Sequence, residues 1–564
     1  METTISNLLH LSDADAAVAE ARDEVRRAQD RLRSLISYRN TLLPIEALPD
    51  EILLEVFNIL VHSSFTPSYQ WIPVTHVCRR WRTAALGCPV LWTRIHCVFP
   101  KSQLLHRLDA FLERSQPCPI DVDLPFNTSW YYEPGFKQVL EQRHRWRNVA
   151  TLEISPDFMF ELQELQVRKL ELPLVETLDV HFGNFFAFQN LNEITNPSLP
   201  ALKRLTSDFI RWPVFKTWMV PTLVHLEVSG HSHLHTATLA DWIAALRPLS
   251  SLQTLVLRNT FDHISLDEDI AGASPSPILI HLPFLRTLRI VARSQNGLGA
   301  GVSLSTHIAS PWSTEVKIEC QRPLELEVHG CEAPFTTMAV KTGVSISNRP
   351  AEDDSAIWVW FSWVDRGLHM KVIDMGPTPE RTLLDMQFPA QHDAENRPAL
   401  EDFVAHVVRG CPSLCNASML LLVNLGMGRA MWDALKPSPV PQVLIGRKVF
   451  PTFLDALEAD PGAFMPELDF LTVCTLPRRS RLPIPRPEQK VGQAQRPLLQ
   501  RLADAFDERR SFGLGPTSVS FGHGKVDNAA PQRDSSHAVQ TDNLLHDEED
   551  ENQDLSLPAL FGTC

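Results

Sequence analysis

The sequence predicts a mixed α/β protein with four parts. A long N-terminal helix and a small all-helical module precede an irregular solenoid of short parallel strands and helices. Three observations predict this order: a heptad pattern at the start, two amphipathic helical patterns after it, and a Leu-x-apolar motif that recurs further along the chain. A polar, acidic stretch at the end predicts a disordered tail.

The overall composition excludes several classes of function. The formal net charge of −15 argues against nonspecific nucleic-acid binding, which requires a basic face. The longest apolar runs fall well short of the roughly 20 residues that span a bilayer, so no membrane partner is expected. The N-terminus lacks the basic region of a signal peptide. We therefore expect a cytoplasmic or nuclear protein in which most of the 10 scattered cysteines are free and buried.

Residues 1–43 show the pattern of one long helix. Ser12 followed by Asp15 resembles a capping box. The apolar seam is interrupted at Arg39, and its spacing alternates between three and four residues, as in a heptad repeat. The seam consists of Val18, Ala21, Val25, Ala28, Leu32, Leu35 and Leu42. It predicts either a short coiled coil with another chain or a helix folded back on the next domain; we favour the second because the two alanines make the seam thin.

Residues 44–96 contain two amphipathic helical patterns and a short closing segment. Pro49 precedes a helix, and a polar connector leads to a second helix over 74–86. Pro89 ends this helix, and Leu91 and Trp92 close the unit. A core this small can hardly bury three large aromatic side chains at once, so we expect some apolar surface to face a partner. The three aromatic residues are Phe57, Trp81 and Trp92.

Three blocks in this module resemble an F-box. The first is the Leu48-Pro49-x-Glu51-Ile52-Leu53-x-x-Val56-Phe57 opening, the second is Val77-Cys78-Arg79-x-Trp81, and the third is Pro89-x-Leu91-Trp92. The connector, which carries Tyr69 and Trp71, is longer than the family pattern. This difference affects where the helices begin and end, and not the resemblance to an F-box. The whole chain resembles F-box proteins with irregular leucine-rich repeats that are common in mushroom-forming fungi.

The resemblance implies a partner and a set of contact residues. The family's F-box binds the Skp adaptor protein and, through it, a cullin-based ubiquitin ligase. Contact with the adaptor would come from Leu48, Pro49, Ile52, Leu53, Val56 and Phe57. A second set would divide between adaptor contact and the module's own core: Val77, Cys78, Trp81, Leu91 and Trp92.

The function that follows is a substrate-recognition subunit with an unknown target protein. The alternative is an F-box scaffold that acts without ubiquitin transfer. No nucleophile elbow, phosphate-binding loop or zincin motif occurs in the chain, so we expect neither an enzyme nor a cofactor.

Residues 97–475 contain an irregular repeat. A motif of the form apolar-x-x-Leu-x-apolar recurs, with its second apolar position at 152, 178, 205, 226, 255 and 288, and the copy at 205 is weaker because Thr206 and Ser207 follow it. The steps of 26, 27, 21, 29 and 33 residues are close to those of leucine-rich repeats, which run from about 20 to 29 residues. Each motif predicts a short strand, and the pattern returns at 468–473. Turns before the strands are indicated by Pro173, Pro200, Pro221 and Pro283.

Between the motif copies, 239–246 predicts a helix. The pattern fades over 295–400, where Gly297, Gly299 and Gly301 predict a loop and not a phosphate-binding site. Segments 324–328 and 357–364 predict strands that extend the sheet or form an insertion.

Two clusters of metal-ligating residue types are weak evidence for a metal site. The triplet His231, His233 and His235 indicates a solvated turn more than a zinc site, and the pair Cys411 and Cys415 has no second pair. We therefore expect no metal.

The C-terminal region divides in two. Residues 476–514 predict a linker and a capping helix over 497–510, which Gly513 ends. Residues 515–564 predict a disordered tail with an acidic run at 547–551.

Overall fold

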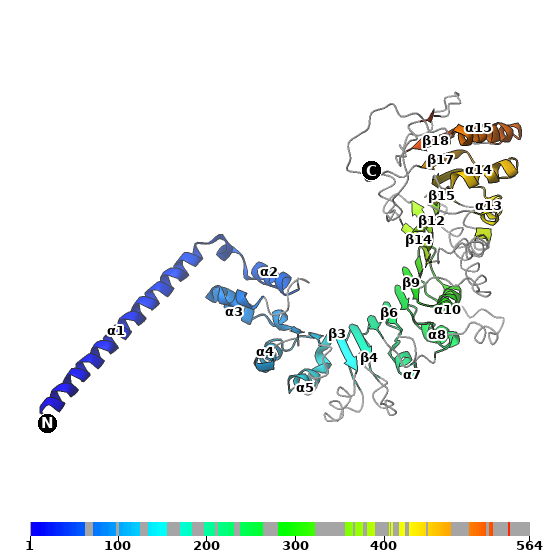
Figure 1. Ribbon diagram of the computed structural model, residues 1–564. Helices are drawn as coiled ribbons and strands as arrows, with labels where there is room; N and C mark the ends of the chain where they lie inside the picture. The colour runs from blue at the N-terminus through cyan, green and yellow to red at the C-terminus, as the bar shows by residue number, and fades with distance from the viewer. Residues whose placement is uncertain are drawn as a thin grey trace. The chain divides into compact units, whose positions relative to one another are not determined.

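The structure is a computed structural model (Figure 1). It divides into a first unit, residues 1–179, and a second unit, residues 180–564. The residues that it describes are 2–62, 71–96, 101–124, 134–154, 170–182, 197–208, 212–230, 237–262, 280–321, 356–364, 367–375, 381–389, 405, 408–409, 417–423, 428–446, 449–474, 496–514, 518–522 and 540–541.

The first unit begins with one long helix, α1 (Glu2–Thr41). The helix runs through Ser12 without a break, so the predicted capping box there is wrong. Residues 13–39 are all exposed. The predicted folding back onto the next domain is therefore also wrong for this stretch, because a packed helix would bury one face.

The helical module follows, with α2 (Asp50–His62) at the position that the sequence predicts. The predicted second helix over 74–86 is instead divided into η2 (Ile72–His76) and α3 (Arg79–Leu86). Cys78 lies between them in an extended conformation, and its Sγ accepts a hydrogen bond from the Trp81 amide at 3.4 Å. This N-cap starts a new helix and explains the division. Two further short helices are η1 (Pro44–Ala47) and η3 (Pro89–Trp92).

The module's core extends into the helix that follows, α4 (Lys101–Arg114). The Trp92 ring packs edge-on against Phe111 with centroids 5.1 Å apart and against Trp71 at 4.8 Å. The Arg114 guanidinium lies 4.4 Å from the Trp92 ring centroid. Trp92 and Phe57 are therefore buried by the chain itself, although the sequence suggested that the module alone could not cover them.

The rest of the first unit is a small parallel sheet with helices. Strand β1 (Arg94–His96) pairs with β2 (Ile120–Asp123), which pairs with β3 (Trp146–Ile154). The accompanying helices are α5 (Pro134–Glu141) and η5 (Arg143–Arg145). Strand β4 (Thr177–Phe182) lies at the division between the units.

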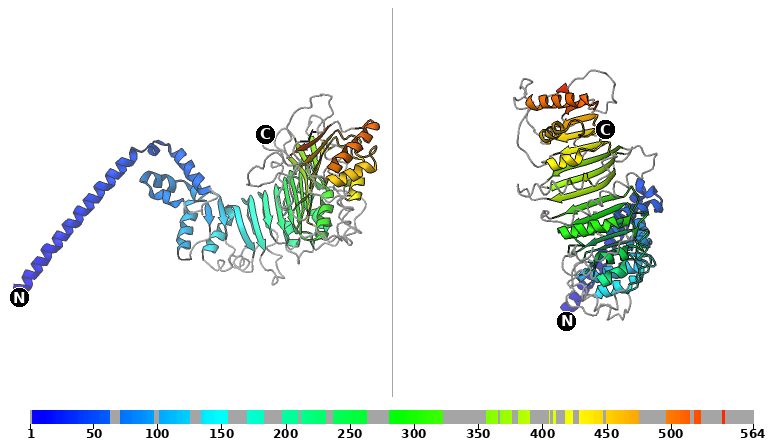
Figure 2. Two further views of the ribbon diagram at one scale, coloured as in Figure 1. Left: turned by 45° about the horizontal axis from the view of Figure 1, so that its top comes forward. Right: turned by 90° about the vertical axis from the view of Figure 1, so that its right-hand side faces the viewer.

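The second unit is a large, mainly parallel sheet with helices on one side of the strands (Figures 1 and 2). Its helices are α7 (Trp212–Phe215), η7 (Lys216–Trp218), α8 (Leu239–Leu246), α10 (Gln295–Thr306), α13 (Arg429–Leu435), α14 (Phe450–Ala459) and α15 (Arg496–Ser511).

The second unit contains strands at the motif positions and further strands between and after them. They are β5 (Arg204–Ser207), β6 (His225–Ser229), β7 (Thr254–Arg258), β8 (Ile280–His281), β9 (Thr287–Ala292), β10 (Ile308–Ala309), β11 (Glu315–Cys320), β12 (Ala356–Val364), β13 (Gly367–Met375), β14 (Arg381–Pro389), β15 (Met419–Val423), β16 (Gln442–Gly446), β17 (Phe470–Cys474), β18 (Ser518–Gly522) and β19 (Gln540–Thr541). Every predicted motif copy coincides with a strand, and α8 occupies the predicted range. Segment 324–328 lies outside the described residues.

The pairing order is β5-β6-β7-β9-β11-β14-β13-β12-β15-β16-β17-β18-β19. All these pairs are parallel except those of β13, which is antiparallel to both β14 and β12. This meander lies within the region of 295–400 where the motif fades. It extends the sheet, because β12 and β14 keep the direction of the strands beside them.

The strands are in register, so equivalent side chains form continuous rows. One row runs Leu205, Leu226, Leu255, Leu288, Val316, Leu384, Val372, Val359, Leu420, Val443, Leu471, Val519. We call it the aliphatic row. Its members are buried as far as the structure describes their side chains, except Val519, which is half-buried.

Turns lead into these strands. The amides of Val175, Leu202, Leu223 and Leu285 each donate to the carbonyl three residues earlier, at 3.1 to 3.3 Å. The predicted prolines occupy the second position of these turns, where a fixed φ is favourable. The predicted turns are therefore confirmed.

The glycines over 295–301 do not form the predicted loop but lie inside α10. Ser294 caps this helix by accepting a hydrogen bond from the Gly297 amide at 3.1 Å. A Cβ on Gly301 would lie 2.6 Å from Ile290 Cγ2. Gly301 is needed because α10 packs directly on β9, and a Cβ on Gly297 would instead meet Asp262. The helix tolerates its glycines because the tertiary contacts outweigh their low helix propensity.

The C-terminal part is more structured than the sequence predicts. Helix α15 is present and ends before Gly513, whose φ is +75°. Val519 and Phe521 on β18 pair with Leu471 and Val473 on β17, so this segment of the predicted disordered tail is instead a strand. Its alternation of apolar and small residues suits a strand with two different faces. The acidic run at 547–551 lies outside the described residues.

We expect Leu255→Ala to lower the free energy of unfolding of the second unit by about 2–5 kcal/mol, because it opens a cavity within the aliphatic row. Denaturant unfolding measures this change. Thr254→Ala is the control, since Thr254 is only half-buried on the adjoining position of the same strand, and it should change stability by no more than about 0.5 kcal/mol. Equal effects of the two substitutions would contradict the importance of the row.

Candidate functional site

Helix α2 has two apolar faces, and only one is covered. Leu53, Phe57 and Val61 are buried in the core of the module. On the neighbouring face, Ile52 is 51% exposed and Val56 is 42% exposed. Ile59 continues this face one turn further on and is also exposed. The row Ile52, Val56 and Ile59, which we call the apolar stripe, is surface of the kind that commonly marks a partner-binding site.

The structure separates the residues that the sequence groups together. Leu53, Phe57, Leu91 and Trp92 belong to the core. Pro49, Ile52, Val56 and Val77 are exposed, and Leu48, Cys78 and Trp81 are half-buried. The sequence did not single out Ile59, although its position seven residues after Ile52 places it on the same helical face.

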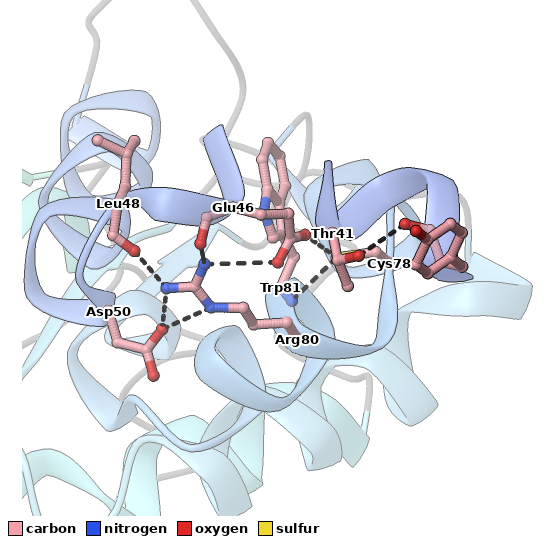
Figure 3. A network of polar contacts seen from close by, with 8 residues as sticks. Thr41, Glu46, Leu48, Asp50, Cys78, Arg80 and Trp81 are labelled. Atoms are coloured by element: carbon pink, nitrogen blue, oxygen red, sulfur yellow. Dashed lines mark hydrogen bonds and ion pairs between the residues drawn. The ribbon is translucent and has the colours of Figure 1, made fainter. Parts of the chain in front are cut away.

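Arg80 fixes the segment that leads into α2 (Figure 3). Its Nη1 donates to the Glu46 carbonyl oxygen at 2.6 Å, and its Nη2 donates to the Leu48 carbonyl oxygen. Nη2 and Nε both donate to Asp50 Oδ1, at 2.6 and 2.9 Å. One guanidinium on α3 therefore holds η1 and the first residue of α2, as its fork of donors allows.

The neighbouring carboxylates of Asp50 and Glu46 stabilise the charge of Arg80. The hydrogen bond to Asp50 raises the pKa of the Arg80 guanidinium above its ordinary value, although partial burial opposes this effect. Arg80 occupies the variable position of the Cys-Arg-x-Trp block, so the motif gave no reason to single it out. Its neighbours Arg79 and Arg82 are exposed.

Cys78 and Trp81 connect α3 to the same segment. Cys78 Sγ lies 3.4 Å from Glu46 Oε1 (Figure 3). The Trp81 ring packs edge-on against Phe57 with centroids 5.3 Å apart. The block from Val77 to Trp81 thus positions α2 through its core face and leaves the apolar stripe uncovered.

The family model described as F-box-like matches residues 45–98. Residues 45–98 form an F-box-like domain. The match begins at the segment held by Arg80 and ends just after β1. Among curated proteins, no match to the chain is found.

A second candidate site lies on the sheet face opposite the aliphatic row. Ion pairs lie there: Glu227 to Arg258 at 2.8 Å and Arg289 to Glu319 at 3.0 Å join neighbouring strands, and Lys317 to Glu319 at 2.9 Å lies within β11. Burial alone would raise the pKa of Glu319, but hydrogen bonds from Lys317 and Arg289 lower it below its ordinary value. These side chains are 18–34% exposed, so this charged face is partly open to solvent.

Asp385 on β14 ends this network. Its carboxylate lies 2.7 Å from His369 Nε2 and 3.9 Å from Lys317 Nζ. Because an ionised carboxylate only accepts hydrogen bonds, Nε2 carries the proton of this pair. Burial acts to raise the pKa of Asp385, but the His369 hydrogen bond and the charges of His369, Lys371 and Lys317 together lower it.

Among the described residues, no group of His, Cys, Asp or Glu side chains is placed to hold a metal ion. The triplet His231, His233 and His235 and the pair Cys411 and Cys415 lie outside the described residues. Within the described ranges, each helix is too short or too polar to cross a membrane.

We expect Arg80→Ala to release the segment before α2, because its two carbonyl oxygens and the Asp50 carboxylate lose their donor. Hydrogen exchange measured by mass spectrometry should be about tenfold faster or more in peptides over 44–53. Arg79→Ala and Arg82→Ala are the controls, since both arginines are exposed on the same helix. Equal exchange in all three variants would show that the Arg80 contacts do not hold the segment.

We expect Asp385→Asn to lower the free energy of unfolding at pH 7 by about 1.5–3 kcal/mol, the range for a hydrogen bond to a charged group. Because the folded pKa of Asp385 is below its ordinary value of 3.8, this stabilisation is complete above that pH. It is lost as the pH falls through the lower folded value, so the variant and the original protein should converge in acid. Urea unfolding at a series of pH values measures the difference.

Asp433→Asn is the control for this substitution. Asp433 is 62% exposed and lies 3.9 Å from Arg429, and such a surface pair contributes about 0–1 kcal/mol. A difference that persists unchanged at the lowest pH would contradict the assignment.

Proposed function

We propose that this protein is the substrate-recognition subunit of a Skp–cullin–F-box ubiquitin ligase. The observation that carries the proposal is the uncovered apolar stripe of α2 within an F-box-like domain. F-box domains generally bind the Skp adaptor, and an apolar helical face of this kind can serve as the anchor of a protein interface.

The division of α2 into two faces assigns different roles to the predicted contact residues. Ile52 and Val56 contact the adaptor directly, and Ile59 extends this contact. Leu53 and Phe57 act through the core, since they are fully buried in this structure. Pro49 and Val77 are exposed and belong to the contact surface.

The second unit would hold the target protein. Its consecutive parallel strands and the motif spacing support an irregular leucine-rich-repeat-like solenoid, in which each unit buries its apolar face against its neighbours. Helices cover the face of the aliphatic row, so the charged part of the opposite face, over β6 to β14, is the one that can meet a target. Partly exposed charges of both signs favour recognition through electrostatic complementarity.

The protein would act without a catalytic site of its own. The F-box-like domain docks on the adaptor, the solenoid holds the target, and a separate enzyme transfers ubiquitin. This mechanism requires only proximity and places the protein in the cytoplasm or nucleus, where the ligase operates.

We expect Ile52→Asp and Val56→Asp each to weaken binding to purified Skp adaptor by at least about 2 kcal/mol, roughly 30-fold, because each buries a charge in an apolar interface. Isothermal titration calorimetry with the full chain measures this loss. Circular dichroism should show an unchanged fold, because both side chains are exposed. Leu53→Ala and Phe57→Ala should instead lower the melting temperature.

Leu174→Asp is the matched control. Leu174 lies in the first unit outside the F-box-like domain and is 44% exposed, close to the value for Val56. It should leave adaptor affinity unchanged. Unaltered binding by folded stripe variants would overturn the adaptor site.

Co-purification with the adaptor separates the two functions of an F-box protein. Recovery of both adaptor and cullin supports the ligase subunit. Adaptor without cullin would favour a scaffold that acts without ubiquitin transfer.

A further inference from the structure

Helix α1 carries an apolar seam that the chain leaves uncovered. Val18, Val25, Leu32 and Leu35 are 48–58% exposed, and Ala21 and Ala28 between them are exposed too. These residues recur at the a and d positions of a heptad: Val18, Val25 and Leu32 at a, and Ala21, Ala28 and Leu35 at d. A helix of this length with one apolar seam gains stability by pairing that seam with another helix.

The seam is poorly suited to a parallel pair of identical helices. In such a pair, each a or d residue meets its own copy. Ala21 would face Ala21 and Ala28 would face Ala28, which leaves two thin layers. Arg39, at the next a position, would face a second Arg39 and add like-charge repulsion in the core.

An antiparallel pair corrects each of these defects. In antiparallel coiled coils, an a residue faces a d residue of the other helix. Setting Val25 against Ala28 of the second copy also sets Leu32 against Ala21 and Val18 against Leu35. Every alanine is then opposite a larger side chain, so the layers are more equal in volume and leave less void. Arg39 falls opposite Ala14, a small residue that leaves space for it.

The charges beside the seam agree with the same register. On the outer face, Asp23 pairs with Arg26 at 3.0 Å and Asp30 with Arg33 at 2.8 Å within the helix. In the part of the chain that the structure describes, Glu24 forms no ion pair at its g position beside the seam.

Arg31, seven residues after Glu24, likewise forms no ion pair among the described residues and occupies the next g position. In the antiparallel register, Glu24 of each copy faces Arg31 of the other. Arg39 comes next to Asp15 of the second copy, beside Ala14. The acidic start of the helix therefore meets the basic end of its counterpart, whereas a parallel pair would align like charges.

We propose that α1 forms an antiparallel coiled coil with α1 of a second copy of this chain. The dimer has Val25 opposite Ala28 and two symmetric Glu24–Arg31 ion pairs. In this register the C-terminal ends of the two helices are about 40 Å apart, since each residue adds 1.5 Å along the helix. Because the F-box-like domain starts three residues after Leu42, the dimer presents two adaptor-binding domains from opposite ends of one rod.

The charge pair allows a test by reversal and rescue. Analytical ultracentrifugation of the full chain should show a dimer. Glu24→Arg and Arg31→Glu should each raise the dimer dissociation constant by about tenfold or more. Each substitution replaces both of the symmetric ion pairs with a pair of like charges. The double variant Glu24→Arg/Arg31→Glu should restore dimerisation, since the charges again face their opposites.

Matched controls lie one turn earlier on the outer face. Glu20→Arg and Arg27→Glu make the same charge changes away from the seam and should leave the dissociation constant within about twofold. A double variant that remains as weak as the single variants would overturn the register. A chain that stays monomeric at about 100 µM, a limit of roughly −5.5 kcal/mol in binding energy, would overturn the dimer.

Disulfide trapping tests the orientation independently. A mixture of Val25→Cys and Ala28→Cys chains should form a mixed disulfide between residues 25 and 28, identified by peptide mass spectrometry. Each variant alone should give little cross-linking at its own position. Efficient trapping of Val25→Cys with itself would show a parallel pair and overturn the proposal.

Discussion

The second unit depends on the aliphatic row, because a short strand with two inward side chains cannot bury an apolar surface alone. The register from β5 to β17, with one irregularity between Val372 and Ile373, places Leu or Val beside an equivalent residue on each neighbour. The aliphatic row then determines which face of the sheet the helices cover. Helices cover that face, and α10 reaches it closely enough that Gly301 has no space for a Cβ beside Ile290. On the opposite face, charges pair between strands from β6 to β14, and Trp360, Ile373, Leu421 and Leu444 form a buried apolar cluster on β12, β13, β15 and β16.

The F-box-like domain has too few residues to cover its large aromatic side chains by itself. Its core would be too small for Phe57 and Trp92, but α4 supplies Phe111 and Arg114 from outside the three blocks. With the core completed in this way, α2 can leave the apolar stripe exposed at no loss of internal packing. Arg80 then holds the entry to α2 by polar contacts alone, so the domain needs no further apolar side chain at that end.

Periodic features could be predicted from the sequence, and contacts between distant residues could not. Helix α8 and the strands of the motif follow from local apolar spacing, which is why 239–246 is predicted without error. The division at Cys78 depends on a side-chain cap, and Gly301 of α10 depends on the approach of β9, so neither can be predicted from spacing. Arg80 was missed for the same reason: its partners lie about 30 residues earlier and form one site only after folding.

The exposed surfaces of the first unit differ in what they can bind. The apolar stripe of α2 consists of Ile52, Val56 and Ile59, which carry no charge. Its affinity for a partner protein therefore comes from desolvation and shape complementarity. The seam of α1 is thinner, because alanine occupies two of its positions, and apolar burial alone would stabilise its pairing only weakly. Glu24, Arg31 and Arg39 add direction to that pairing, since only one orientation brings opposite charges together. Two neighbouring apolar surfaces on one chain can therefore bind different partners without competing.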